Sequence, residues 1–150
     1  MPHDTPEAAY VAASNRMNEG RLHALLGITI EEVSPGRVVV SLPVGPHLHQ
    51  PYGLMHGGVS LALAESAASI GGNVACAEGK AALGQEINAN HLRSVREGTV
   101  RAVATPVHIG RTSQVWAIEV RDDAGQLICI SRCTLAVIDA PPGVPATPRA

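Results

Sequence analysis

The chain has 150 residues, a formal net charge of −2 at pH 7 and 45% hydrophobic residues. This length suits one compact domain with its own core, and the charge offers no basic field for nucleic acid or for an anionic membrane surface. Phe is absent and aromatic residues make up 2% of the chain, so the core must be built from Val, Ile, Leu and Ala.

The first expected element is an alanine-rich helix over residues 5–18, capped by Thr5. One further turn over residues 22–26 is expected to stop at Gly27. We interpret residues 1–27 as a helical lead-in to the main domain. The N-terminal sequence contains neither the basic nor the apolar region of a secretory signal, so we expect a cytoplasmic location.

Two strands are expected next, over residues 28–34 and 37–44, because Pro35-Gly36 between them is a turn signal. The second strand shows the period of two that is typical of strands. One of its faces carries Val38, Val40, Leu42 and Val44, and the other carries Arg37, Val39, Ser41 and Pro43.

A long helix is expected over residues 57–77, where apolar side chains recur at helical spacing at Leu63, Ala67, Ile70 and Val74. Its apolar run approaches the length of a membrane span. Glu65 and Asn73 in its interior favour a buried helix of a soluble domain instead. We therefore expect no membrane association.

The chain becomes β-rich after this helix, and four more strands are expected, over residues 83–92, 99–109, 113–121 and 127–138. Glu97-Gly98 and the segment 122–125 are expected to form hairpin-type connections, the latter as a type I turn with Gly125 in the left-handed conformation. Residues 139–150 are rich in Pro, which cannot donate to a sheet, and are expected to be a disordered tail.

The order of two strands, one long helix and four strands predicts an α+β fold over residues 28–138. We expect an antiparallel, curved, six-stranded sheet wrapped around the helix, whose many Ala and Gly residues allow close approach. Trp116 alternates with Ile118 and Val120 and is assigned to the core. Three cysteines without metal-ligand spacing are expected to be buried, reduced thiols: Cys76, Cys129 and Cys133.

Glu65 is the first candidate for chemistry. No cationic residue stands within one helical turn of it, so a surface ion pair does not explain it. A buried, unpaired carboxylate is costly and is seldom found without a partner or a task. The helix start offers free N–H groups to developing negative charge, so the combination points to acyl chemistry. The alternative is a tolerated acid whose head reaches solvent or a subunit contact.

Two motifs support this interpretation, His56-Gly57-Gly58 at the helix start and Ala64-Glu65-Ser66 inside the helix, together with segments 108–111 and 121–125. With the element order, they resemble the hotdog-fold acyl-CoA thioesterases over residues 25–138. The resemblance is strongest to the PaaI-like branch with the Arthrobacter-type 4-hydroxybenzoyl-CoA and the 1,4-dihydroxy-2-naphthoyl-CoA thioesterases. It implies hydrolysis of an acyl-CoA, with aryl-CoA among the candidates, no cofactor apart from the substrate's own CoA, and a homodimer or homotetramer.

The resemblance also implies roles for five residues. Glu65 attacks the thioester carbonyl or activates water, which Ser69 holds. Gly57 donates its backbone N–H to the carbonyl oxygen, and Gln50 and His56 orient the carbonyl. Structural alternatives stay open: Ser69 can bond back to its own helix, His56 can be a structural hydrogen-bonding residue, and the glycines can relieve a tight turn.

Coenzyme A needs cations for its phosphates, and the candidates are Arg93, Arg96 and Arg111. The polar or backbone contributors are Gly58, His91, Ser94, Gly110 and Thr112. Arg111 matches the turn that lies by CoA in the resembling family, and an exposed solubilising charge is the alternative for each arginine. A zinc site at His47, His49 and His56 lacks an acidic neighbour and a well-placed third ligand, so no metal is expected.

Two other functions stay open. A hotdog hydratase or dehydratase acting on enoyl-CoA needs an Asp and a His a few residues apart, and no such pair opens this helix. A non-catalytic acyl-CoA-binding domain is the third possibility, against which the full set of Gln50, His56, Gly57, Glu65 and Ser69 argues. The acyl group stays unidentified, because without Phe an aromatic group would pack mainly against aliphatic walls.

Overall fold

The computed structural model describes residues 5–142. In chain order the elements are α1 (Pro6–Met17), α2 (Leu22–Leu26), β1 (Thr29–Ser34), β2 (Arg37–Val44), the 3-10 helix η1 (Pro46–Leu48), α3 (Gly57–Ala75), β3 (Lys80–His91), β4 (Gly98–Ile109), β5 (Ser113–Arg121) and β6 (Leu127–Asp139). These bounds confirm every element expected from the sequence, with small shifts at the ends of α3 and β3.

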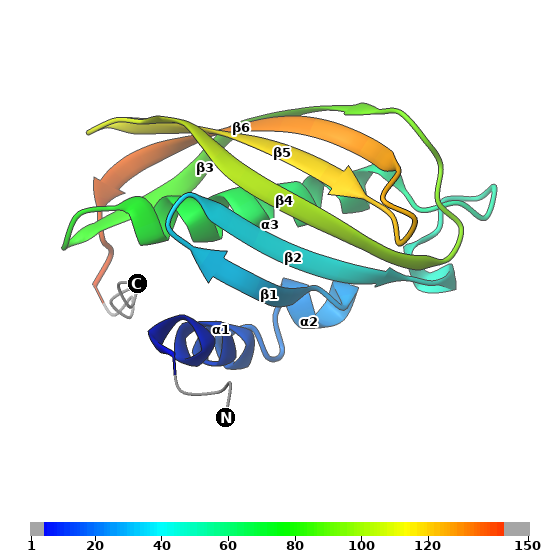
Figure 1. Cartoon of the computed structure of the whole chain (residues 1–150), viewed down its shortest axis with the longest axis horizontal. Helices are drawn as coiled ribbons and strands as arrows, with labels where there is room; N and C mark the ends of the chain where they lie inside the picture. The colour runs from blue at the N-terminus through cyan, green and yellow to red at the C-terminus, as the bar shows by residue number, and fades with distance from the viewer. Residues whose placement is uncertain (1–4, 143–150) are drawn as a thin grey trace.

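The six strands form one sheet in the order β1-β2-β4-β5-β6-β3, and every neighbouring pair is antiparallel. The sheet curves around α3, while α1 and α2 lie beside β1 (Figure 1). This arrangement confirms the predicted α+β hotdog architecture. Its two edge strands are β1 and β3.

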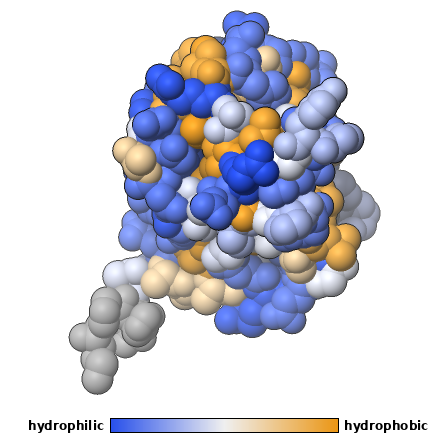
Figure 2. Space-filling model, turned by 90° about the vertical axis from the view of Figure 1, so that its right-hand side faces the viewer, coloured by the Kyte–Doolittle hydropathy of each residue, from blue (hydrophilic) through white to orange (hydrophobic). Residues whose placement is uncertain are grey.

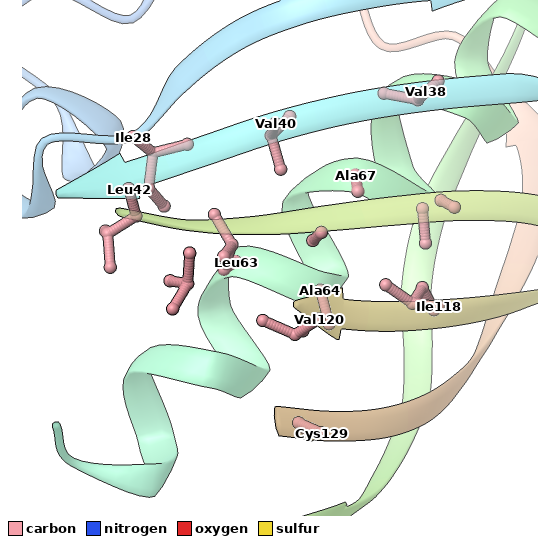
Figure 3. Close-up of a cluster of buried hydrophobic side chains, with 14 of the residues drawn as sticks. Ile28, Val38, Val40, Leu42, Leu63, Ala64, Ala67, Ile118, Val120 and Cys129 are labelled. Atoms are coloured by element: carbon pink, nitrogen blue, oxygen red, sulfur yellow. The ribbon is translucent and has the colours of Figure 1, made fainter. Parts of the chain in front are cut away.

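The core lies between α3 and the concave face of the sheet. Leu63, Ala64 and Ala67 on α3 are fully buried and face side chains such as Val40 and Ile118 from the strands (Figure 3). The prediction for Trp116 is confirmed, since this residue is only 1% exposed. Its ring lies against Gly71 of α3, where a Cβ would come 2.6 Å from the indole, so the helix backbone does approach the sheet closely.

The N-terminal helices begin and end where their capping residues stand. The Thr5 hydroxyl accepts from the Ala8 N–H at 3.2 Å, and Gly27 closes α2 with φ of 82°. The Asn15 side chain bonds to both the N–H and the C=O of Ile30 in β1, at 2.9 and 3.0 Å. Helix α1 therefore occupies hydrogen-bonding groups on the β1 edge that would otherwise be open.

The second strand is buried on both faces along its middle. Val39 and Ser41 are 6% and 7% exposed, although they lie opposite the face that carries Val38 and Val40. Because β2 lies between β1 and β4, side chains of both neighbours flank its outer face: Ser41 pairs with Thr29 and Arg101. Alternation in the sequence could not reveal that shielding.

The connection through Glu97-Gly98 is not a hairpin, so that prediction is wrong. β5 and β6 separate β3 from β4, and residues 92–97 therefore cross from one part of the sheet to another. The second predicted connection is confirmed, since the Gly125 N–H donates to the Asp122 carbonyl at 2.9 Å and Gly125 has φ of 78°.

The start predicted for the C-terminal tail, residue 139, is wrong. Asp139 still belongs to β6, and its carboxylate pairs with Lys80 at 2.6 Å. Residues 143–150, the rest of the predicted tail, lie outside the described part of the chain. Among the residues that are described, no helix combines the length and the apolar character needed to cross a membrane.

The three cysteines are free thiols. Cys129 and Cys133 are buried in the core, as predicted. Cys76 is a free thiol but only half-buried, so the prediction of burial is met in part there. Burial raises the pKa of the Cys133 thiol to about 11, and the negative charges of Glu65 and Glu86 add to this effect. Cys133 is therefore a neutral thiol at neutral pH.

Candidate active site

The N-terminus of α3 is capped by His56. His56 has extended backbone angles, and its Nδ1 accepts from the Gly58 N–H at 2.9 Å. A neutral imidazole that accepts at Nδ1 carries its hydrogen on Nε2, so a second donor remains available. Gly57 is the first helical residue, and its N–H has no intrahelical acceptor. The Gly57 N–H and the His56 Nε2–H are therefore two donors at the positive end of the helix dipole.

The loop before α3 is tied to the crossover segment. The Met55 N–H donates to the Val95 carbonyl at 2.7 Å, and the His49 ring hydrogen-bonds the Arg96 carbonyl at 2.7 Å. The Gln50 side-chain oxygen accepts from the Tyr52 N–H, which leaves the Gln50 amide N–H groups free to donate. These contacts place Gln50 and His56 in one fixed loop.

Glu65 lies two turns further along α3. Within residues 5–142 its half-buried carboxylate has no hydrogen-bond or ion-pair partner. It lines a cavity of about 710 Å³ between α1, α2, α3 and the start of β3. An acid without a partner at a cavity of ligand size fits a chemical role better than a structural one.

Gly84 is a part of this site that sequence reasoning missed. A Cβ built at Gly84 would overlap Glu65 Oε1, and the register of β3 shifts between Gly84 and Glu86. The bulge and the missing side chain together leave room for the carboxylate. A glycine inside a strand pattern is the signal that could have indicated this close approach.

Two serines that follow Glu65 on α3, Ser66 and Ser69, behave differently. Ser66 donates its hydroxyl to the Ala62 carbonyl at 2.7 Å, so it accepts from His23 Nε2 at 2.8 Å. Ser69 makes no such back-bond: within the described chain its hydroxyl has no partner. The structural alternative considered for Ser69 thus applies to Ser66, and the Ser69 hydroxyl is free to hold a water beside Glu65.

His23 was also missed by sequence reasoning. Burial lowers the pKa of this histidine, and its Nδ1 is buried without a hydrogen-bond partner among the described residues. The ring is therefore neutral near pH 7 and donates through Nε2. It links α2 to α3 one residue away from Glu65.

The proposed CoA contacts divide into two groups at opposite ends of the sheet. His91 lies against Gly57, where a Cβ would be 2.8 Å from His91 Nε2, and Arg96 lies equally close to Gly53. The exposed Arg93 and Ser94 belong to the same end. Figure 2 views this end, where hydrophilic side chains surround a smaller hydrophobic area.

The second group forms the turn between β4 and β5. The Thr112 carbonyl accepts from Val137 at 3.0 Å, close to the start of β3, and Gly110 and the exposed Arg111 lie in the same turn. Figure 1 shows this turn and the crossover segment 92–97 at opposite ends of the molecule. One chain therefore does not bring Arg111 together with Arg93 and Arg96.

The loop histidines are used separately. His49 bonds to the Arg96 carbonyl and His56 caps α3 through Nδ1, whereas His47 is exposed. No group of three or more His, Cys, Asp or Glu side chains within residues 5–142 is arranged to hold a metal ion.

Comparison with known proteins places this geometry in a family. Residues 52–129 match the Thioesterase superfamily, and the chain belongs to that family. The 1,4-dihydroxy-2-naphthoyl-CoA hydrolase of Listeria monocytogenes is 49% identical over 116 residues, which cover 77% of this chain and 94% of that protein. The protein of the same name in Escherichia coli is 46% identical over 127 residues, covering 84% and 93%.

A solved structure agrees with this assignment. A thioesterase from Haemophilus influenzae superposes with a TM-score of 0.83 at 43% identity, covering 86% of this chain and 90% of that one. The predicted recognition of a hotdog thioesterase is confirmed, and the chain is a thioester hydrolase of this family.

Substituting Gly84 is expected to disable Glu65 without touching it. In Gly84→Ala the new methyl group occupies the space of the carboxylate and must displace it. Misplacing a catalytic group by about 1 Å costs on the order of 10²-fold in rate. The hypothesis that Glu65 acts in catalysis therefore predicts a loss of that size in kcat, measured by thiol release from an acyl-CoA.

The matched control is the double variant Gly84→Ala with Glu65→Asp. The shorter Asp side chain leaves room for the methyl group. Gly84→Ala should therefore lower kcat much less in the Glu65→Asp background than in the wild type. Equal factors in both backgrounds would contradict the proposed overlap.

Proposed function

We propose that this protein is an acyl-CoA thioesterase in which Glu65 acts as nucleophile or general base. The observation that carries the proposal is the Glu65 carboxylate, which lies at a cavity of about 710 Å³ and has no hydrogen-bond or ion-pair partner among residues 5–142. The names of the relatives from L. monocytogenes and E. coli, both hydrolases of a CoA thioester, support the same reaction. Cys133, the thiol affected by the charge of Glu65, is protonated, so it does not compete as the nucleophile.

The reaction can follow two balanced courses. In the first, a Glu65 oxygen bonds to the thioester carbon, the C–S bond breaks, the CoA sulfur leaves as a thiolate that takes up a proton, and water hydrolyses the resulting anhydride. In the second, Glu65 takes a proton from water as the water oxygen attacks the carbonyl carbon; the C–S bond then breaks, and that proton passes to the leaving CoA sulfur. In both, the Gly57 N–H stabilises the oxyanion, Gln50 and His56 orient the carbonyl, and Ser69 holds the water.

A single chain does not complete this site. Gly57 and Glu65 are eight residues apart on α3, a separation of about 12 Å along the helix axis. One carbonyl cannot meet both groups at hydrogen-bond and attack distances. We therefore propose that the Gly57 donor comes from a second copy of the chain.

Strand β3 lies at the edge of the sheet, and pairing of two such edges can bring the Gly57 donor of a second copy to Glu65. Gly84 lies at Glu65 and His91 lies at Gly57, so the two ends of β3 mark the two half-sites. If two β3 strands pair antiparallel about an axis between residues 87 and 88, Gly84 of one copy stands opposite His91 of the other. Each Glu65 then comes near the Gly57 of the second copy.

The same pairing joins the two groups of CoA candidates. The turn around Arg111 lies at the β3 start, and the segment with Arg93 and Arg96 lies at the β3 end. Antiparallel pairing brings the start of one β3 to the end of the other. We propose a homodimer, which can associate further into a homotetramer, as the working unit.

An acyl-CoA panel followed by thiol release tests the proposed reaction. We expect CoA to be freed from at least one thioester with wild-type protein. Hydration of an enoyl-CoA without thiol release would favour the hydratase alternative, and tight CoA-thioester binding without either reaction would favour a binding domain.

Replacing Arg111 by Ala is expected to raise KM for CoA thioesters with little change in kcat. The guanidinium is proposed to hold a phosphate that takes no part in the reaction, so its loss removes binding shared by ground and transition states. Losing one such charge-assisted contact costs about 1.5–3 kcal/mol, or roughly 10- to 150-fold in KM.

Arg37→Ala is the matched control, because Arg37 is ion-paired with Glu32 on β1, away from the proposed site. For a thioester that lacks the nucleotide, KM should be the same in Arg111→Ala as in the wild type. An equal loss with that short thioester would contradict the assignment.

A further inference from the structure

The cavity beside Glu65 has an unusual wall. One side is formed by Glu65, Ser69 and Ile70 of α3, and the opposite side comes from the N-terminal helices, including Tyr10 and Leu22. These helices lie outside the residues 52–129 that match the family. The segment first interpreted as a lead-in therefore belongs to the surroundings of the reacting carboxylate.

This wall is fixed to the rest of the molecule. Asn15 ties α1 to Ile30 of β1 by two hydrogen bonds, and His23 ties α2 to Ser66 of α3 at 2.8 Å. A wall held from both ends has a defined distance from Glu65. It can therefore select ligands by size and shape.

The cavity offers apolar surface that no residue of the described range 5–142 covers. Met17, Leu22 and Leu83 line it and remain 47%, 55% and 50% exposed. Apart from Glu65 and Ser69, the polar side chains on its α3 side are already used, since the Asn73 amide bonds to Ala82 and the Ser66 hydroxyl bonds to His23. Clustered, exposed apolar side chains beside satisfied polar groups are typical of a ligand site.

Tyr10 is the aromatic residue of this wall. The chain has no Phe, one Trp and two Tyr; Trp116 is in the core and Tyr52 is 84% exposed. Tyr10 is half-buried, and burial raises the pKa of its phenol, partly offset by a hydrogen bond with Ser14. The phenol is therefore uncharged near neutral pH, and Tyr10 adds aromatic surface to the lining of the cavity while it packs partly against the core.

We propose that Tyr10 is a specificity-determining residue that packs its ring against the far end of the acyl group and selects bulky, apolar acyl groups over short ones. The proposal rests on the proposed thioesterase function, because Glu65 sets where the carbonyl lies. An acyl group with its carbonyl at Glu65 extends between Ile70 and the α1–α2 wall. A short acyl group leaves the wall untouched and gains nothing from Tyr10.

Binding of non-hydrolysable ketone analogues tests this independently of turnover. The probes are S-(2-naphthoylmethyl)-CoA and S-acetonyl-CoA, titrated calorimetrically into wild type, Tyr10→Phe, Tyr10→Ala, Leu22→Ala and Leu25→Ala. Leu25 is the matched control, being 73% exposed on α2 and absent from the cavity lining. Circular dichroism melting of each variant verifies folding.

For the naphthoyl probe, Tyr10→Ala should raise Kd on the order of tenfold, and Leu22→Ala should raise it several-fold. Tyr10→Phe keeps the ring and should stay within about twofold, as should Leu25→Ala. The acetonyl probe should bind all five proteins within about twofold of each other.

The proposal is overturned if Tyr10→Ala shifts the Kd of both probes equally, or if Tyr10→Phe binds the naphthoyl probe as weakly as Tyr10→Ala does. It is also overturned if the naphthoyl probe binds wild type no more tightly than the acetonyl probe. If no thioester is hydrolysed but the selective shifts appear, the thioesterase function fails and the role of Tyr10 stands. If hydrolysis is observed and the shifts are equal, the reverse holds.

Discussion

Glu65→Gln is expected to remove most thioester hydrolysis, with a loss in kcat of about 10²–10⁴-fold for a group that acts as base or nucleophile. Gln has the same shape as Glu, and within the described chain Glu65 has no partner to lose, so folding should be unaffected. The comparison is kcat for CoA release at saturating acyl-CoA, wild type against variant.

The binding of the naphthoyl ketone analogue serves as the internal control for this variant. Glu65→Gln should bind it at least as well as wild type, because a charge next to an apolar ligand is removed. Near-wild-type turnover in the folded variant would remove Glu65 from the mechanism.

The second large effect is expected from removing a single N–H. Gly57→Pro deletes the proposed oxyanion donor at the first position of α3, where proline fits a helix well. The preceding residue, His56, has φ of −64° and ψ of 134°, an extended conformation that a following proline favours. Loss of one oxyanion donor costs about 10²–10³-fold in kcat.

Gly57→Ala is the matched control for this substitution. Ala brings the same Cβ toward His91, which is exposed and can shift, but it keeps the N–H. We expect Ala to retain most of the activity that Pro loses. Equal losses in the two variants would show that the donor is not what matters at Gly57.

Local structure was largely predictable because its causes are local. Thr5, Gly27 and the turn at residues 122–125 act through neighbours in the sequence, so capping and turn chemistry located the ends of α1, α2 and β5. The spacing of Leu63 and Ala67 likewise predicted which face of α3 is buried.

Strand order was less accessible, because it depends on contacts between distant segments. Glu97-Gly98 has the composition of a hairpin turn, yet β3 pairs with β6 and β4 with β2. The low exposure of Val39 and Ser41 has the same origin, since side chains of β1 and β4 flank them on both sides. A pattern within one strand carries no information about its neighbours in the sheet.

For the site, the sequence and the resemblance indicated which residues to consider but not which ones meet. His91 was grouped with Arg111 as a CoA contact, whereas it lies at Gly57, at the other end of the sheet from the Arg111 turn. Gly84 and His23 act through long-range approach to Glu65 and Ser66. Such pairings depend on the register of β3 and on the docking of α2, which only the folded chain reveals.

Subunit mixing tests the central claim, that Glu65 of one chain and Gly57 of another form one thioesterase site. Glu65→Gln and Gly57→Pro are each purified, mixed in equal amounts, and allowed to exchange, with hybrid formation verified by native mass spectrometry. A hybrid dimer holds one site with both groups intact and one with neither. Since half of the dimers are hybrids after random exchange, we predict CoA release at about a quarter of the wild-type rate, against near-background activity for each variant alone. Verified hybrids that stay at background would contradict the shared site.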